Sequence, residues 1–150
     1  MLDFHQDEGD FVKFPTVVSD IMKELICIES KAIVVDAAKI MIEKEIGSII
    51  VTENGIPTGI ISRTDLIARI IVVNLDPNKL TTKQIMSSPL LSIGKNSTIL
   101  EAMRYISAHD VHQILIKDDD KLIGIVSEGD LIRAVTLSSL TQFSSILRRK

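Results

Sequence analysis

The sequence has few of the residues on which several classes of function depend. Cys27 is its only cysteine, which excludes a disulfide within the chain and is consistent with a reducing compartment. Tryptophan is absent and aromatic residues make up 3% of the chain, so few side chains can stack on the bases of a nucleic acid. No apolar run reaches the ~18 residues of a membrane-spanning helix, because Arg69 interrupts the longest candidate.

The chain also has no excess of positive charge. Its net charge is −3 and its isoelectric point about 5.6, so the whole molecule does not attract DNA, and only residues 148–150 (Arg-Arg-Lys) are locally basic. The first ten residues are acidic and do not resemble a signal peptide. We therefore expect a soluble, cytoplasmic protein that binds neither nucleic acid nor a membrane.

Patterns typical of an enzyme are missing as well. The sequence shows no nucleophile beside a base, no paired metal-ligand spacing and no glycine-rich Walker or Rossmann loop. We predict no catalysis, no catalytic cofactor and no metal site.

What the sequence does contain is one segment written twice, 65 positions apart. Residues 59–66 read Gly-Ile-Ile-Ser-Arg-Thr-Asp-Leu, and residues 124–131 read Gly-Ile-Val-Ser-Glu-Gly-Asp-Leu. The same offset aligns residues 34–37 with 99–102. These matches show that the chain contains an internal repeat. Halves of this size are near the lower limit for folding alone, so we expect them to share an interface. The expected division is an N-terminal arm 1–16, repeat one 17–75, a linker 76–81, repeat two 82–138 and a C-terminal tail 139–150.

Each half reads strand, helix, strand, strand, helix. Apolar residues at helical spacing predict amphipathic helices over 35–45 and 100–109, the second with a capping box between Thr98 and Glu101. Apolar runs around turns predict two hairpins. The remaining expected elements are short first strands at 26–28 and 90–93, and second helices at 65–74 and 130–138. Phe4, Phe11 and Phe14 lie in the arm, which we expect to pack on its own domain or on a second copy.

The two Ser-x-x-Asp segments have two interpretations. Ser62 with Asp65, and Ser127 with Asp130, fit a capping box, in which the carboxylate only satisfies amides at a helix start. An ionised carboxylate can equally accept hydrogen bonds from both hydroxyls of a ribose, and a helix N-terminus favours phosphate. We also expect Gly59 and Gly124 to leave room for a ligand against the backbone.

The doubled set of motifs resembles a tandem pair of CBS domains, the module named after cystathionine β-synthase, over about residues 17–136. The resemblance implies an α+β fold in which two βαββα repeats pack sheet to sheet about a pseudo-two-fold axis as one CBS-pair module. It also implies two clefts between the repeats that bind adenosine compounds, namely AMP, ADP, ATP, S-adenosylmethionine or NAD.

Transferred residue by residue, the resemblance implies the members of both clefts, with the aspartates on the ribose hydroxyls. Cleft one takes Ser62, Arg63, Thr64, Asp65, Leu90, Val111, His112 and Gln113. Cleft two takes Ile26, Ile46, Gly47, Ser48, Ser127 and Asp130. Gly129 stands where Thr64 stands in the first half, so cleft two lacks a hydroxyl and cleft one is favoured.

The function expected from this resemblance is a nucleotide-sensing regulatory module. Ligand in the clefts would change the relative orientation of the repeats and so regulate a partner protein. The resemblance further implies a homodimer. The alternative is a ligand-free dimerisation scaffold with vestigial clefts.

Overall fold

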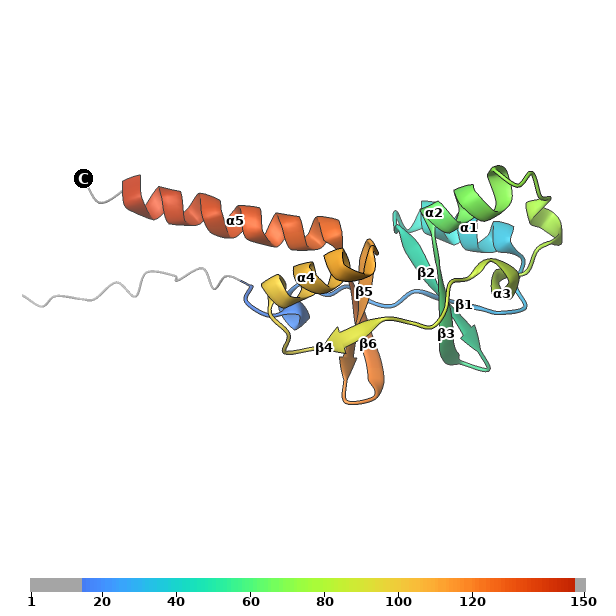
Figure 1. Cartoon of the computed structure of the whole chain (residues 1–150), viewed down its shortest axis with the longest axis horizontal. Helices are drawn as coiled ribbons and strands as arrows, with labels where there is room; N and C mark the ends of the chain where they lie inside the picture. The colour runs from blue at the N-terminus through green and yellow to red at the C-terminus, as the bar shows by residue number, and fades with distance from the viewer. Residues whose placement is uncertain (1–14, 148–150) are drawn as a thin grey trace, which may run out of the picture.

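The chain folds into two lobes, each built on a three-stranded sheet, as seen in a computed structural model (Figure 1). The structure describes residues 15–147, with side chains as far as Thr141. The phenylalanines of the predicted arm and the basic residues 148–150 lie outside the described residues. The α+β class expected from the sequence is confirmed.

Both lobes have the predicted order of strand, helix, strand, strand, helix. The first lobe contains β1 (Cys27–Glu29), α1 (Val34–Glu43), β2 (Ser48–Glu53), β3 (Ile56–Ser62), α2 (Arg63–Leu66) and the π-helical η2 (Ile67–Ile71). The second lobe contains β4 (Ser92–Gly94), α4 (Ile99–His109), β5 (Gln113–Asp118), β6 (Lys121–Ser127) and α5 (Glu128–Leu147). Three short helices precede or join the lobes: η1 (Val18–Asp20), η3 (Pro77–Lys79) and α3 (Thr82–Ile85).

The two sheets have the same strand pairing and the same register. β1 pairs parallel to β2 and β4 parallel to β5, while each hairpin is antiparallel. Ser48 lies opposite Ser62, and at the matching place Gln113 lies opposite Ser127. Each hairpin also has a register shift at the same repeat position, after Val51 in the first lobe and after Ile116 in the second. The repeat found in the sequence is therefore a repeat of structure.

The short segments that lead into the repeats are exchanged between the lobes. Val18 of η1 belongs to the buried core of the second lobe, and Ile85 of α3 belongs to the core of the first. Backbone hydrogen bonds hold both segments in place: the Val18 amide donates to the Ser97 carbonyl, and the Thr82 amide donates to the Ala32 carbonyl. The chain therefore passes from one lobe to the other twice.

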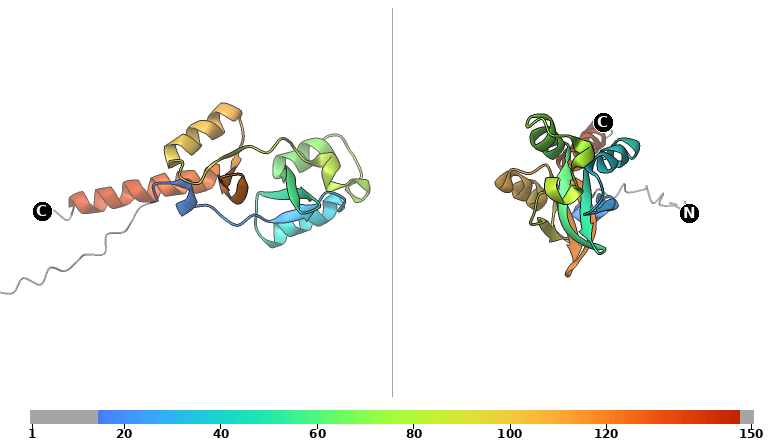
Figure 2. Two further views of the ribbon diagram at one scale, coloured as in Figure 1. Left: turned by 90° about the horizontal axis from the view of Figure 1, so that it is seen from below. Right: turned by 90° about the vertical axis from the view of Figure 1, so that its right-hand side faces the viewer.

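We call residues 23–26 and 87–91 the first and second crossing segments; both run between the lobes in Figures 1 and 2. Lys23 begins the first and exchanges two backbone hydrogen bonds with Ile125 of β6. Ser87 begins the second and exchanges two with Ile60 of β3. Lys23 and Ser87 are therefore equivalent positions in the two halves.

The faces of the sheets that turn away from the helices are also buried. Ile49 and Val51 of β2 belong to the core under the helices, so the alternation of side chains directs Ile50 to the opposite face. Ile50 is nevertheless only 1% exposed, and Leu115, its counterpart on β5, is 2% exposed. We infer that each is covered by the other lobe, which is the sheet-to-sheet packing expected from the sequence.

The second helices differ from their predicted lengths. The prediction that the last helix ends near Ser138 is wrong, because α5 continues to Leu147 and projects away from the lobes in Figure 1. Its Ser and Thr hydroxyls donate to carbonyls one turn earlier, as Thr136 does to Ile132 and Ser138 to Ala134. These residues thus meet their hydrogen-bonding needs without ending the helix. In the first lobe the helix begins at Arg63 and passes into the π-helical η2.

Candidate functional site

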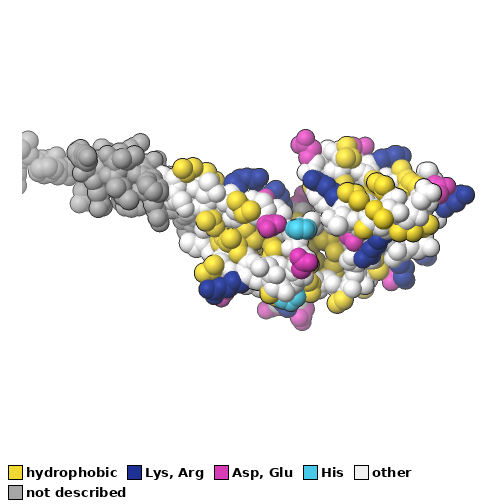
Figure 3. Space-filling model, turned by 45° about the horizontal axis from the view of Figure 1, so that its top comes forward, with side chains coloured by type: hydrophobic (Ala, Val, Ile, Leu, Met, Phe, Trp, Pro, Cys, Tyr) yellow, Lys and Arg dark blue, Asp and Glu magenta, His cyan; other side chains and the backbone are white. Residues whose placement is uncertain are grey.

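A cleft of about 470 Å³ lies between the lobes, and we call it the inter-lobe cleft. Its volume is within the range of about 300–1,000 Å³ typical of small-molecule sites. Figure 3 shows the surface hollowed between the lobes, with histidine and acidic side chains at the rim. The lining residues come from both lobes and the first crossing segment: Lys23, Glu24, Ile26, Glu45, Ile46, Gly47, Ser48, Ile50, Ser62, Arg63, Thr64, His112, Gln113, Ile125, Ser127, Glu128, Gly129, Asp130 and Arg133.

On the second-lobe side, the passage from β6 into α5 places Ser127 and Asp130 on the cleft. Asp130 Oδ2 accepts hydrogen bonds from the Ser127 hydroxyl at 2.7 Å and the Ser127 amide at 3.1 Å. The Asp130 amide donates in turn to the Ser127 hydroxyl at 3.2 Å. This is a complete capping box, and it fixes both side chains at the start of α5.

The other carboxylate oxygen of Asp130 is held by two cations. Lys23 Nζ lies 2.8 Å from Oδ1, and a guanidinium nitrogen of Arg133 lies 3.3 Å from it. Burial raises the pKa of the Asp130 carboxyl, but hydrogen bonds from Lys23 and Ser127 outweigh burial, so the pKa lies below its ordinary value. Asp130 is therefore an ionised hydrogen-bond acceptor at neutral pH.

Asp65, the counterpart of Asp130 in the first lobe, serves a different set of contacts. Its Oδ2 caps α2 through the Ser62 amide and hydroxyl. Its Oδ1 accepts a hydrogen bond from the Ser87 hydroxyl at 3.0 Å and lies 3.4 Å from the guanidinium of Arg69. Arg69 also donates to the carbonyls of Ile85 and Met86, so Asp65 takes part in a network that fastens the second crossing segment to the first lobe.

The lining of the cleft includes apolar residues, and at Gly47 the two lobes come close together. Ile26 and Ile50 line the cleft together with Ile125 of the second lobe, which provides apolar contact surface. At Gly47 a Cβ would lie 3.7 Å from Nε2 of Gln113 and 3.8 Å from the Arg63 guanidinium. The lobes therefore approach closely at this glycine.

Comparison with known proteins identifies the repeat. The CBS domain family model matches twice, at residues 18–72 and 83–137. This chain belongs to the CBS domain family. Proteins with tandem CBS domains are typically regulatory and ligand-binding.

Individual relatives support the same assignment. An uncharacterized protein of Methanocaldococcus jannaschii is 30% identical over 116 residues, which are 75% of this chain and 62% of that protein. The hypoxic response protein 1 of Mycobacterium tuberculosis is 25% identical over 130 residues, 85% of this chain and 91% of that protein. The crystal structure of an uncharacterized conserved protein from Pyrococcus horikoshii superposes with a TM-score of 0.76 at 26% identity, covering 82% of this chain and 94% of that one. The chain thus spans about three fifths of the archaeal sequence relative's length.

The CBS repeats bring most of the expected site residues to one place. All six residues assigned to cleft two line the inter-lobe cleft. From cleft one, the residues that line it are Ser62, Arg63, Thr64, His112 and Gln113. Asp65 and Leu90 do not line it, and Val111 lies with His112 on a separate groove of the second lobe, between α4 and α5. The structure therefore assembles cleft two more completely than cleft one, although the sequence favoured cleft one.

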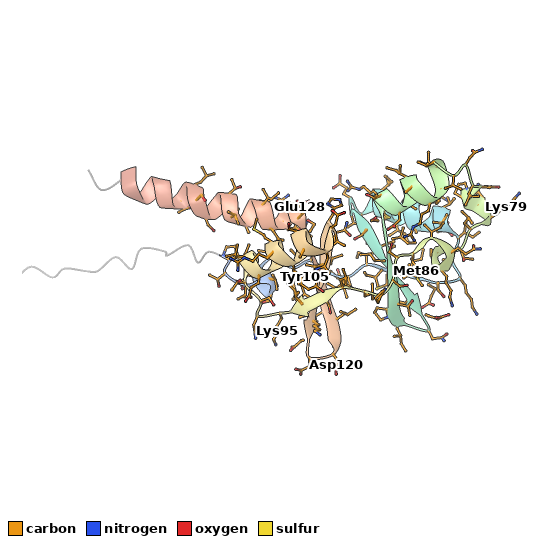
Figure 4. All side chains as sticks on the ribbon, viewed as in Figure 1. Lys79, Met86, Lys95, Tyr105, Asp120 and Glu128 are labelled. Atoms are coloured by element: carbon orange, nitrogen blue, oxygen red, sulfur yellow. The ribbon has the colours of Figure 1, made fainter. Side chains whose placement is uncertain are left out.

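His112 has a partner at the rim of the cleft. Its Nδ1 lies 3.2 Å from Oε2 of Glu128, and both side chains are exposed. Figure 4 labels Glu128 at the edge of the second lobe that faces the first. Either side chain can turn into solvent, so the pair does not block the cleft.

The expectation that the motif glycines leave room for ligand is wrong. A Cβ on Gly59 would lie 2.4 Å from Met86 Sδ, and one on Gly124 would lie 2.6 Å from Met22 Sδ. These glycines therefore accommodate the methionines at the ends of the exchanged segments (Met86 is labelled in Figure 4), and the ligand space lies elsewhere.

Sequence reasoning missed several residues of the cleft, among them the cations Lys23 and Arg133. Arg133 follows Asp130 by one helical turn, and this spacing is visible in the sequence. Lys23 carried no such signal, because its place beside Asp130 depends on the exchange of segments between the lobes. Within residues 15–147, no three His, Cys, Asp or Glu side chains gather as a metal site, and no helix is long and apolar enough to cross a membrane.

Proposed function

We propose that this protein binds an adenosine-containing ligand in the inter-lobe cleft and thereby regulates a partner protein. The observation that supports the proposal best is a single cleft, lined by both CBS repeats, that combines apolar walls with a buried, ionised carboxylate. Candidate ligands are AMP, ADP, ATP, S-adenosylmethionine and NAD. The proposal includes no catalytic step.

The chemistry of the lining suits the three parts of a nucleotide. A ribose offers two neighbouring hydroxyls, and Asp130 is an acceptor without protons of its own. Adenine requires flat apolar contact, which Ile26 and Ile46 supply. A phosphate requires cations, and Lys23 and Arg63 lie on the same cleft.

Regulation follows from the position of the cleft between two bodies. A ligand that contacts the first lobe at Gly47 and the second at Asp130 favours the relative orientation in which both contacts form. A partner that binds one orientation preferentially would then respond to the ligand, with a coupling of about 1–3 kcal/mol in typical systems.

We further propose that the molecule is a homodimer, held together through the helices that follow each hairpin. Large apolar side chains are exposed on both, including Ile67, Ile71 and Val72 in and after η2, and Ile132 and Val135 on α5. Ile67 and Ile132 are equivalent positions of the two repeats, so the exposed apolar surface itself has the symmetry of the fold. Light scattering at micromolar concentration should give twice the chain mass of 16.6 kDa, and a monomer mass would contradict this proposal.

Calorimetric titration with the five candidate ligands tests the proposed binding. We expect binding of at least one of them, and Asp130→Asn should weaken it about tenfold or more, since a charge-assisted hydrogen bond becomes a neutral one. Asp65→Asn is the matched control, because Asp65 lies at the equivalent repeat position but does not line the inter-lobe cleft. Equal losses in the two variants would show that cleft one, to which the sequence assigned Asp65, binds as well.

The second candidate function is the ligand-free scaffold. It is favoured by the fact that both oxygens of Asp65 and both oxygens of Asp130 already accept hydrogen bonds or ion pairs from the protein. If no adenosine compound produces heat or raises the melting temperature, the scaffold is the better account of the function than the sensor.

A cytoplasmic location also stays a prediction, which cell fractionation would test.

A further inference from the structure

The equivalent carboxylates of the two repeats are held by chemically different groups. From the crossing segments, the ammonium of Lys23 lies 2.8 Å from Asp130 Oδ1, whereas the neutral hydroxyl of Ser87 lies 3.0 Å from Asp65 Oδ1. An arginine of the following helix is near each oxygen as well, Arg133 at 3.3 Å and Arg69 at 3.4 Å. Lys23 and Ser87 occupy the same place in the two halves, since each begins a crossing segment and pairs with the matching strand, β6 or β3. Within the described part of the chain, therefore, only the carboxylate on the inter-lobe cleft is paired with a lysine from a crossing segment.

The contacts of Asp130 leave one oxygen for a ligand. Oδ2 holds the capping box with Ser127, and its loss would undo the start of α5. Oδ1 is held only by long side chains that are largely in solvent: Lys23 is 62% exposed and Arg133 67%, against 7% for Asp130. A hydroxyl donor that reaches Oδ1 therefore competes with these two cations, of which Lys23 is the nearer, at 2.8 Å against 3.3 Å for Arg133.

Displacement leaves the Lys23 ammonium close to the ligand. The backbone of Lys23 is fixed by its two hydrogen bonds to Ile125, so the ammonium can swing only within the reach of its four-carbon stem. A ligand that carries a phosphate next to its ribose offers this ammonium a new anionic partner. An uncharged or cationic ligand offers none, so the ion pair with Asp130 is lost without replacement.

We propose that Lys23 determines which adenosine compounds the cleft accepts: it competes with the ribose for Asp130 and favours ligands whose phosphate receives it after displacement. This proposal rests on the proposed function, since it concerns the ligand class of the same cleft. Phosphorylated adenosine is selected over adenosine and over S-adenosylmethionine, whose sulfonium is positive. Lys23 is thus a specificity-determining residue.

The test compares adenosine with AMP in calorimetric titrations of the full chain. In Lys23→Met the competitor for Asp130 is gone, so adenosine affinity should rise by about threefold to tenfold, while AMP affinity falls or stays level. The preference for AMP over adenosine should then shrink about threefold or more. Lys23→Arg keeps the positive charge and should keep most of the preference.

Lys83→Met is the matched control. Lys83 Nζ forms an ion pair of 2.7 Å with Glu53 that does not line the inter-lobe cleft, so this variant should leave the preference unchanged. Thermal melting in the absence of ligand verifies that each variant is folded.

Two results would overturn the proposal while leaving the proposed function intact. In the first, Lys23→Met binds AMP and adenosine with the wild-type affinities. In the second, it gains affinity for both equally, which would make Lys23 a competitor that is released into solvent. Failure of the wild-type protein to bind any adenosine compound would remove the proposed function itself, and this proposal with it.

Discussion

Gly124→Ala tests the close contact on which the exchange of segments depends. A Cβ at residue 124 would lie 2.6 Å from Met22 Sδ, 2.9 Å from its Cγ and 3.0 Å from its Cβ. Rotation of the thioether alone cannot relieve three such contacts, so the whole methionine must move. Overpacking of this kind costs about 1–3 kcal/mol of unfolding free energy. For a chain of this length we expect the melting temperature to fall by roughly 2–12 °C.

The same substitution should also weaken ligand binding, because Met22 directly precedes Lys23. Gly59→Ala is the matched control: it displaces Met86, which has the equivalent contact and precedes Ser87. Both variants should lose similar stability in urea unfolding. Only Gly124→Ala should lose affinity for AMP, since the second crossing segment does not line the inter-lobe cleft.

Double-mutant analysis shows whether the methionine is the cause. Met22→Ala should lower the unfolding free energy less in the Gly124→Ala variant than in the wild type, because it removes the crowded atoms. The coupling free energy between the two substitutions should exceed about 0.5 kcal/mol. Stability unchanged within about 0.5 kcal/mol in both glycine variants would refute the packing described for these two positions.

Three further predictions concern local contacts. The folded-state pKa of Asp130 is lowered, so its stabilisation is complete above its unfolded value of about 3.9 and is lost as the pH falls through the folded pKa. Urea unfolding should therefore show a steeper acid loss in the wild type than in Asp130→Asn; parallel curves would contradict this. Thr98→Ala should cost about 1 kcal/mol in thermal melting and Thr98→Ser much less, and an unchanged melting temperature would argue against the cap. Arg69→Met should cost about 1–2 kcal/mol because two backbone carbonyls lose a charged donor, whereas Arg133→Met should cost less than about 1 kcal/mol; equal losses would be inconsistent with these contacts.

The repeat, the hairpins and the first helix of each half could be predicted from the sequence because their signals are local. Alternating and helical apolar spacing is visible within about ten residues, and doubling gives each pattern an independent second example. The capping box of Thr98 and Glu101 is confirmed for the same reason, since its residues lie within one helical turn.

The exchange of the short segments that lead into the repeats could not be predicted, because each segment could pack on either of two similar lobes. Val18 and Ile85 are apolar residues that would fit the core of either repeat, and nothing near them in the sequence states which one they join. The contact of Lys23 with Asp130 follows from that choice, across more than a hundred residues. The motif residues of the cleft were therefore found from the sequence, whereas Lys23, whose contact with Asp130 depends on the exchange, was missed.

The two crossing segments differ in how firmly they are held, and we infer that this difference directs the effect of a ligand. Arg69 fastens the second segment through the carbonyls of Ile85 and Met86, and the residue equivalent to Arg69 in the other repeat is Ala134. The first segment has the same backbone pairing, but its side-chain contact is the ion pair of Lys23, which a ligand can displace. A ligand at Asp130 therefore acts on the weaker of the two connections between the lobes. Since Asp130 also caps α5, the reorientation would be transmitted to the helix that carries exposed apolar surface.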